Sequence, residues 1–508
     1  MKTKKQNMRQ ENQIKGSSLS SLRNEKGVAL VSVYLISVLL SGISIATYTR
    51  AISQSRSVDR EIARLKSFAA AEAGIQSAMA QIGNNAYTGY INTSNISAGS
   101  FSSTYGHSVG NYSVTMDYPN SADWVIIHAS ATVNGETQQL EGRVFLNSNL
   151  SKYLIYSNTS TLSLGSNLIL GSDDGVNPQG VPEDPNDRAA TYHTNDLDFS
   201  GTNIHVYADA HAENLIDGST NSYVHGDTYV GAFATNASGA VTNDGINGSL
   251  SVTDGFSDGT DRNNDGVINA SDYPDNHDLT STGDNDSHRI EELDGVDLDF
   301  YQSHNDANIP SSWGSTTTSR YIKLLPSADN TKTKVVEYSS STYTTQVATY
   351  TLANTNSIIY NKGRLHIKEG SITGRVSVVS GDDIMFDGNV AYNGGASYAT
   401  SSHSAAFIAK DKVFLRPTSL EISGIVYAKK DATAGTVALD SDYDTSGNYN
   451  PTAKTNGHFR LFGNVIMDGT GNTANYANDR AYVYDQNLKY FRPPGIPVRP
   501  ELRLVVEE

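Results

Sequence analysis

The sequence predicts a mainly β protein with a long N-terminal α-helix, and three observations support this fold class. Residues 28–49 form an apolar run without a charged residue. The chain from 51 to 82 has no proline and is rich in Ala, Arg, Glu and Gln, which favour helix. From Tyr153 onward, short runs of apolar alternation recur about every 8 to 12 residues with Gly or Asn between them, which is typical of all-β structure.

The composition narrows the classes of partner and site. The chain carries 37 Lys and Arg residues against 54 Asp and Glu, a net charge of −17. This balance repels phosphate backbones, so we expect no nucleic-acid partner. The absence of cysteine excludes disulfides, thiolate metal ligands and cysteine nucleophiles. Between Asp254 and Asp299, 14 acidic residues are accompanied by only two basic ones, Arg262 and Arg289. Charge this dense is costly unless it is solvated or binds cations.

A basic leader, residues 1–27, precedes the apolar run and holds seven Lys and Arg residues against Glu11 and Glu25. The 22 uncharged residues of 28–49 match the roughly 20 that a helix needs to cross a bilayer. Because basic flanks stay in the cytoplasm, we expect one membrane pass with the N-terminus inside and the rest exported. A cleaved secretory signal would show a shorter apolar region and an A-x-A-like site, which is not evident here.

The helix is expected to continue past the membrane as a stem. After Arg50, apolar residues recur at spacings of mostly three and four, as on one face of a helix. A helix over residues 28–82 would be roughly 80 Å long, so only its first half fits in lipid. The second half needs a protein partner along its apolar stripe. The stripe comprises Ile62, Leu65, Phe68, Ala69, Ala73, Met79 and Ile82.

The KG junction at 26–27, the apolar run VALVSVYLISVLL and the element AAAEAGI at 69–75 together resemble the N-terminus of PilX-type pilus-assembly proteins. These are minor pilin-like proteins of type IV pilus and type II secretion systems, and the resemblance covers residues 23–80. It implies a bacterial inner-membrane location, contacts with other pilin-like subunits through the stem, and cleavage by prepilin peptidase between Gly27 and Val28. An uncleaved signal anchor is the alternative. Major pilins carry Glu at the fifth mature position, where this chain has Ser32, as in several tip-type minor members.

Residues 83–149 are expected to form a small antiparallel sheet, so that with the stem they resemble the helix-plus-sheet layout of pilin-like proteins. Asn134-Gly135 is a strong hairpin signal between two alternating runs. The expected apolar positions are Val114, Met116, Val125, Ile127, Val133, Leu140 and Val144.

The remaining chain is expected to be a β-rich head in two parts, 150–253 and 321–492, with an acidic loop insertion at 254–320. Stacked rungs of a parallel β-helix are the preferred architecture, and a β-sandwich is the alternative. Residues 357–498 also resemble a domain of unknown function that follows PilX-type stems, which implies architecture but no chemistry. Residues 493–508, which include PPGIPVRP, are expected to be a Pro-rich extended tail.

The sharpest local motif is DRNNDGVINASD at 261–272, which predicts a Ca²⁺ site. Its spacing resembles dockerin and thrombospondin type 3 calcium loops, with Gly266 at the sharp turn. It departs from an EF-hand because Asp, not Glu, stands at position twelve, and an ordinary Asx-Gly turn is the alternative. Weaker acidic patterns lie at 284–295 and 440–447. The predicted ligands are Asp261, Asn263, Asp265, Val267 (through its carbonyl), Asn269 and Asp272.

No nucleophile-elbow, zincin, P-loop or dinucleotide motif occurs, so we expect no enzyme. The sequence favours a membrane-anchored minor pilin-like protein that displays its head in the periplasm or outside the cell. Its expected role is pilus or pseudopilus assembly, or adhesion to a surface glycan or host ligand. The part of the chain after the stem, about 430 residues, would crowd a filament if every subunit carried it, which favours a rare subunit. The alternatives are a static envelope scaffold and a polysaccharide-active β-helix enzyme.

Overall fold

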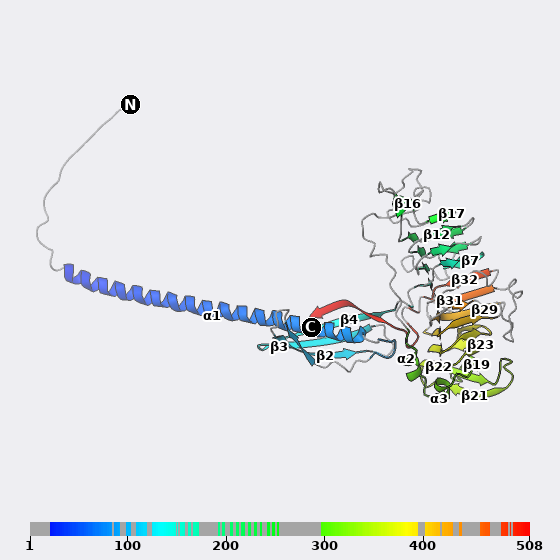
Figure 1. Ribbon diagram of the computed structural model, residues 1–508. Helices are drawn as coiled ribbons and strands as arrows, with labels where there is room; N and C mark the ends of the chain where they lie inside the picture. Colours follow the sequence, from blue (N-terminus) through cyan, green and yellow to red (C-terminus); the bar gives the residue numbers. More distant parts are fainter. Residues whose placement is uncertain are drawn as a thin grey trace, which may run out of the picture.

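The computed structural model describes residues 21–507 with internal gaps, of which the longest are 172–190, 253–295, 439–457 and 468–478. Figure 1 shows a long helix, a small antiparallel sheet against the C-terminal end of that helix, and a large β-rich head beyond the sheet. The predicted fold class, mainly β with a long N-terminal helix, is confirmed.

Helix α1 runs from Ser21 to Gly83, 63 residues and about 95 Å at 1.5 Å per residue. Only its last third packs on the sheet, through a face of small residues. A Cβ atom at Gly74 would lie 3.1 Å from side-chain atoms of Tyr112 and Val114, so helix and sheet are in close contact there. The packed face comprises Ala63, Ser67, Ala70, Ala71, Gly74, Ile75, Ala78 and Ile82.

This face differs from the predicted apolar stripe. Ile82 is buried as expected, but the side chains of Ile62, Leu65 and Phe68 are exposed. Close approach of the helix to the sheet selects small side chains over large ones, so the sheet is not the partner of most of the stripe. The larger apolar residues remain on the open side of the helix.

Four strands follow α1 as an antiparallel meander: β1 (Ala98–Ser102), β2 (Ser108–Asp117), β3 (Trp124–Val133) and β4 (Glu136–Asn147). The β3–β4 hairpin turns at Asn134 and Gly135, whose φ angles are 50° and 86°, which confirms the predicted turn. Because one face of the sheet packs on α1, alternate residues of β3 are buried from Val125 to Ala131.

A fifth strand comes from the far end of the chain. β33 (Arg499–Glu507) pairs antiparallel with β4 and forms an edge of the sheet. The interpretation of 493–508 as an extended tail is corrected by this pairing. Pro500 is compatible with β33 because an edge strand leaves every second N–H group without a ladder partner. The whole head is therefore inserted between the fourth and fifth strands of the sheet.

In the head, strands from successive turns of the chain lie side by side in parallel register. We call this arrangement the coil stack. Parallel pairing agrees with the predicted stacked rungs and not with the β-sandwich alternative. At one end of the stack, β20 and β21 add to β19 by antiparallel pairing. The strands of its later part are β19 (Arg320–Pro326), β20 (Thr333–Tyr338), β21 (Gln346–Thr351), β22 (Asn356–Asn361), β23 (Leu365–Ile372), β24 (Arg375–Ser380), β25 (Ile384–Phe386), β26 (Val390–Tyr392), β27 (Ser404–Ala409), β28 (Lys412–Leu415), β29 (Leu420–Ala428), β30 (Thr436–Ala438), β31 (His458–Met467) and β32 (Asp479–Val483).

The chain enters the coil stack at its middle. Strands β5 and β7, early in the sequence, pair in parallel with β31 and β32, which are the last strands of the stack in sequence. Residues 155–252 thus build one half of the stack and residues 320–483 the other. The earlier strands are β5 (Ile155–Ser157), β6 (Thr161–Ser163), β7 (Leu168–Leu170), β8 (Thr191–His193), β9 (Asp196–Asp198), β10 (Ile204–Val206), β11 (Ala210–Ala212), β12 (Leu215–Gly218), β13 (Ser222–Val224), β14 (Thr228–Val230), β15 (Ala234–Thr235), β16 (Val241–Asn243), β17 (Ile246–Gly248) and β18 (Ser251–Val252).

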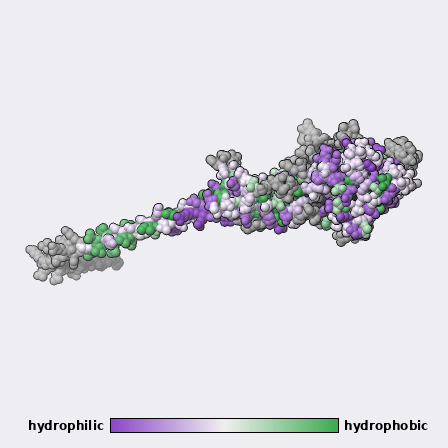
Figure 2. All heavy atoms as spheres, turned by 90° about the horizontal axis from the view of Figure 1, so that it is seen from below, coloured by the Kyte–Doolittle hydropathy of each residue, from purple (hydrophilic) through white to green (hydrophobic). Residues whose placement is uncertain are grey.

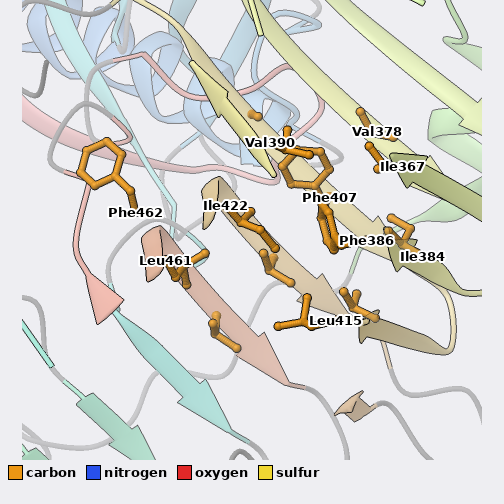
Figure 3. Close-up of a cluster of buried hydrophobic side chains, with 14 of the residues drawn as sticks. Ile367, Val378, Ile384, Phe386, Val390, Phe407, Leu415, Ile422, Leu461 and Phe462 are labelled. Atoms are coloured by element: carbon orange, nitrogen blue, oxygen red, sulfur yellow. The ribbon is translucent and has the colours of Figure 1, made fainter. Parts of the chain in front are cut away.

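Inward side chains of successive turns form the core of the stack (Figure 3). Ile384 and Phe386 pair in register with Val413 and Leu415, and the rings of Phe386 and Phe407 lie 5.0 Å apart. Each such buried side chain stabilises the fold by roughly 1.5–3 kcal/mol.

Two short helices, α2 (Leu298–Ser303) and α3 (Ser311–Ser315), pack beside β22. The α3 residue Trp313 is fully buried against the core. The Arg320 guanidinium lies 5.5 Å from the centre of the Trp313 ring and 2.7 Å from the Glu337 carboxylate. Both helices lie within 254–320, so the described part of that predicted loop, 296–320, contains two short packed helices.

Candidate functional site: the stem helix and its junction with the head

The first half of α1 is exposed and apolar. Among the described residues, α1 is the one helix that is both long enough and apolar enough to cross a membrane. Large apolar side chains from Val28 to Tyr48 are exposed, and Figure 2 shows them as the hydrophobic end of the stem. The hydroxyls of Ser32, Ser44 and Thr47 donate to carbonyls four residues earlier, at 2.8–2.9 Å. These bonds satisfy the polar groups within the helix, as a bilayer requires.

The predicted processing residues lie in the same helix. Gly27 and Val28 both have helical backbone and are exposed, and Gly27 has open space around its Cα atom. The hydroxyl of Ser32 donates a hydrogen bond to Val28 O at 2.8 Å. Cleavage between Gly27 and Val28 stays a prediction.

Beyond the apolar half, α1 carries an exposed apolar stripe, which we define as Val58, Ile62 and Leu65. Their exposed fractions are 57%, 46% and 60%. At 100° per residue, this stripe lies on the side of the helix opposite Ala63 and Ser67, which begin the sheet-packed face. The stripe is therefore free to contact another molecule.

The head is attached to the sheet through a second apolar core on the outer face of the coil stack. Five residues follow one another in register across β22, β24, β27, β29 and β31, and all five are buried. This outer ladder consists of Ile358, Ser377, Ala406, Ile425 and Asn464.

The chain passes between the sheet and the head twice, and each connecting segment accepts a hydrogen bond from one of the two polar residues of the outer ladder. Asn464 Nδ2 donates to Tyr153 O at 2.5 Å, on the segment that follows β4. Ser377 Oγ donates to Pro494 O at 2.6 Å, on the segment that precedes β33. Burial raises the pKa of Tyr301 well above its ordinary value, and its hydroxyl donates to Gly495 O at 2.6 Å.

A third segment, just after α1, completes the junction. Thr88 N donates to Ile496 O at 2.9 Å, and Gly495 N donates to Thr88 O at 2.8 Å. The ring of Tyr87 stacks on Phe300 of α2 with centroids 3.8 Å apart. The orientation of the head on the stem is therefore fixed by hydrogen bonds and ring stacking from segments more than 400 residues apart. No local sequence pattern predicts this junction, and PPGIPVRP, which supplies Pro494, Gly495 and Ile496, indicates only an extended segment.

The predicted calcium ligands, Asp261, Asn263, Asp265, Val267, Asn269 and Asp272, lie outside the described residues, as do the weaker patterns at 284–295 and 440–447. Among described residues, Asp382, Asp383 and Asp411 bring carboxylate oxygens within 4.8 Å of one another. Arg364 Nη2 lies 2.5 Å from Asp383 Oδ2, yet burial keeps the pKa of Asp383 above its ordinary value.

A pocket of about 500 Å³ lies beside α2 and α3. Its carboxylate, Asp306, is buried and already accepts hydrogen bonds from Asn308 N, Ala353 N and Ser357 Oγ at 2.6–3.2 Å. Asp306 therefore holds the loop between α2 and α3 against the start of β22, and both of its oxygens are occupied by these hydrogen bonds.

A polar cluster anchors the loop between β20 and β21 to the coil stack. Asp387 accepts hydrogen bonds from the Tyr343 hydroxyl at 2.8 Å and from Arg416 Nη1 at 3.0 Å, and its Oδ2 lies 3.3 Å from His366 Nδ1. Tyr343 has a φ of 52°, which an ordinary side chain rarely adopts, so these contacts hold a strained backbone. Burial alone would raise the pKa of Asp387, but His366, Tyr343 and Arg416 together hold it below its usual value.

This lowered pKa predicts acid sensitivity of the head. A carboxylate with a depressed folded-state pKa contributes stability above its unfolded pKa of about 3.9, and this contribution is lost as the pH falls through the folded pKa. Urea unfolding midpoints of the wild type should therefore decline below about pH 4 more steeply than those of Asp387→Asn, which cannot titrate. Parallel pH profiles for the two proteins would contradict the prediction.

Comparison with known proteins gives one structural similarity and no family match. No family model and no curated protein match this chain. A solved structure that matches is the crystal structure of the competence-associated pilin ComZ from Thermus thermophilus, with 13% identity. The match covers 88% of this chain and 97% of that chain at a TM-score of 0.25, which is too low to support an argument about fold or function.

Proposed function

We propose that this chain is a membrane-anchored, minor pilin-like subunit that carries its head outside the cytoplasm for pilus or pseudopilus assembly or for adhesion. The observation that carries the proposal is the exposed apolar surface of α1, both from Val28 to Tyr48 and along the stripe Val58, Ile62 and Leu65. The first part suits lipid. The stripe lies past Arg50, outside the apolar run, and therefore suits the stem of another subunit.

The finer features follow from the same proposal. The leader is cytoplasmic, prepilin peptidase cleaves after Gly27, and Ser32 leaves the chain without the acid of a major pilin. The coil stack is a parallel β-helix that acts as a binding head and not as an enzyme, and Ca²⁺ orders the 261–272 loop. The fixed junction supports display, because a rigidly held head points its ligand surface in one direction relative to the stem.

The stem proposal is tested with Leu65→Glu, which places a charge in the stripe. We expect its recovery in sheared surface filaments to fall about tenfold or more, since losing about 1.4 kcal/mol of packing corresponds to tenfold in affinity. Ser57→Glu is the matched control: it adds the same charge at an exposed position beside the stripe and should be recovered like the wild type.

Two outcomes would contradict the proposal. One is wild-type chain that stays wholly in the membrane fraction although filaments are sheared, which would identify a static envelope scaffold. The other is equal recovery of Leu65→Glu and wild type. Mass spectrometry of the mature N-terminus, expected to start at Val28, tests the processing step separately.

A further inference from the structure

Helix α1 becomes basic directly after its apolar run. Residues 50–66 carry five basic side chains against two acidic ones, a net charge of +3 in a chain whose total is −17. All seven are exposed, and Figure 2 shows a hydrophilic stretch of the stem beyond its hydrophobic end. This part of the stem therefore attracts anions although the chain as a whole repels them. The seven are Arg50, Arg56, Arg60, Arg64 and Lys66 with Asp59 and Glu61.

Three of the arginines share one side of the helix. At 100° per residue, Arg50, Arg56 and Arg60 fall within a sector of about 120°, and we call these three residues the basic face. The sector lies on the side of α1 that packs on the sheet from Ala63 onward. Within the described part of the chain, none of the three arginines forms an ion pair. The basic face is therefore open to an anionic partner.

The basic face lies at the depth of lipid headgroups. The apolar run 28–49 is about 33 Å long as a helix, close to the roughly 30 Å of a bilayer core. Arg50 and Arg56 then lie about 2 and 10 Å beyond the core, and the headgroup layer is about 5–8 Å deep on each side. A long arginine side chain bends back into this layer. Arg60, at about 16 Å, is roughly one Debye length beyond it. Both acidic residues lie further from the core than Arg56.

We propose that the basic face binds the anionic headgroups of phospholipids at the membrane surface from which the stem emerges. Charge complementarity supports this partner, because anionic lipids attract basic segments next to a membrane-spanning helix. So does continuity, since Arg50 follows the apolar run without a break in α1. A second stem fits this side less well, because the sheet projects from it, whereas the stripe side of α1 is open.

These contacts hold α1 at one depth and one rotation in the bilayer, and with it the rigidly attached head. The inference rests on the membrane anchoring in the proposed function and adds the class of lipid that the anchor selects.

Local photo-cross-linking to lipid tests the inference. Ser53 lies within the sector of the basic face, and Ser55 lies about 160° away at nearly the same depth. Both are exposed. Full-length Ser53→benzoylphenylalanine and Ser55→benzoylphenylalanine chains are placed in phosphatidylcholine nanodiscs that contain phosphatidylglycerol, and mass spectrometry of the adducts identifies the lipid. Phosphatidylglycerol should be enriched at Ser53 at least threefold relative to Ser55. Molar salt should abolish the difference, because it screens the charges.

Arginine variants connect the enrichment to the basic face. Arg50→Gln combined with Arg56→Gln should abolish the enrichment at Ser53. The matched control, Lys66→Gln combined with Lys362→Gln, removes the same charge at two exposed positions outside the basic face and should leave the enrichment unchanged. Enrichment that survives the loss of both arginines would overturn the inference.

The cross-linking also separates failure of the inference from failure of the membrane anchor. Lipid adducts with the same composition at Ser53 and Ser55 would overturn the headgroup selection and leave the anchoring intact. No lipid adduct at either position would overturn both, because residues this close to the apolar run must meet lipid if the run spans the membrane.

Discussion

Gly463→Ala is expected to lower the free energy of unfolding of the head by about 4 kcal/mol or more, the range of exceptional single substitutions. Gly463 and Gly424 pair directly in neighbouring strands β31 and β29, with φ angles of 143° and 131°. A Cβ atom at Gly463 would overlap the carbonyl oxygen of Gly424. Since that oxygen belongs to the backbone of the next turn, relief requires the two turns to separate.

Gly394→Ala is the matched control. Gly394 also has a positive φ, 84°, but a Cβ atom there would meet nothing within 4 Å. It should therefore cost only the conformational strain of about 1–2 kcal/mol. Urea unfolding measures both variants in a Trp124→Phe background, where the fluorescence comes from buried Trp313 alone. Similar losses for Gly463→Ala and Gly394→Ala would show that the turns are not in contact at Gly463.

Removal of residues 499–508 is expected to unfold the sheet beneath the head while the coil stack remains folded. Without β33, strand β4 loses its ladder partners from Asn147 to Leu140, and each lost hydrogen bond costs about 0.5–1.5 kcal/mol. Val498, buried in the core between α1 and the sheet, loses the strand that fixes its position.

Limited proteolysis with identification of the cut sites measures this effect. Cuts should appear within 98–147 but not within 320–428, because no described side chain of β33 belongs to the core of the coil stack. A chain that ends at Glu507 serves as control and should resist cleavage like the wild type. Cleavage that begins in the coil stack would mean that the head depends on the sheet for its stability.

Local patterns were sufficient for the elements that lie on continuous sequence. The uncharged run at 28–49 and the proline-free continuation predicted α1, and Asn134-Gly135 predicted the β3–β4 hairpin, because helix propensity and turn geometry depend on near neighbours. The junction could not be found in this way. The bonds from Ser377 to Pro494 and from Asn464 to Tyr153 join residues 117 and 311 apart. The sequence around Ser377 and around Asn464 does not distinguish these two donors from other polar residues in strands.

By itself, the sequence determined that the chain has an apolar helix of membrane-spanning length, a small sheet and a β-rich head, since periodicity and charge report which side chains avoid water. Only the tertiary structure decided that β33 returns to the sheet, that β5 stacks on β31, and that Ile62 and Leu65 stay exposed while small residues face the sheet. The physical reason is that these features depend on which surfaces meet. Strand partners and packed faces are selected by backbone hydrogen bonds and steric fit between segments that are distant in the sequence.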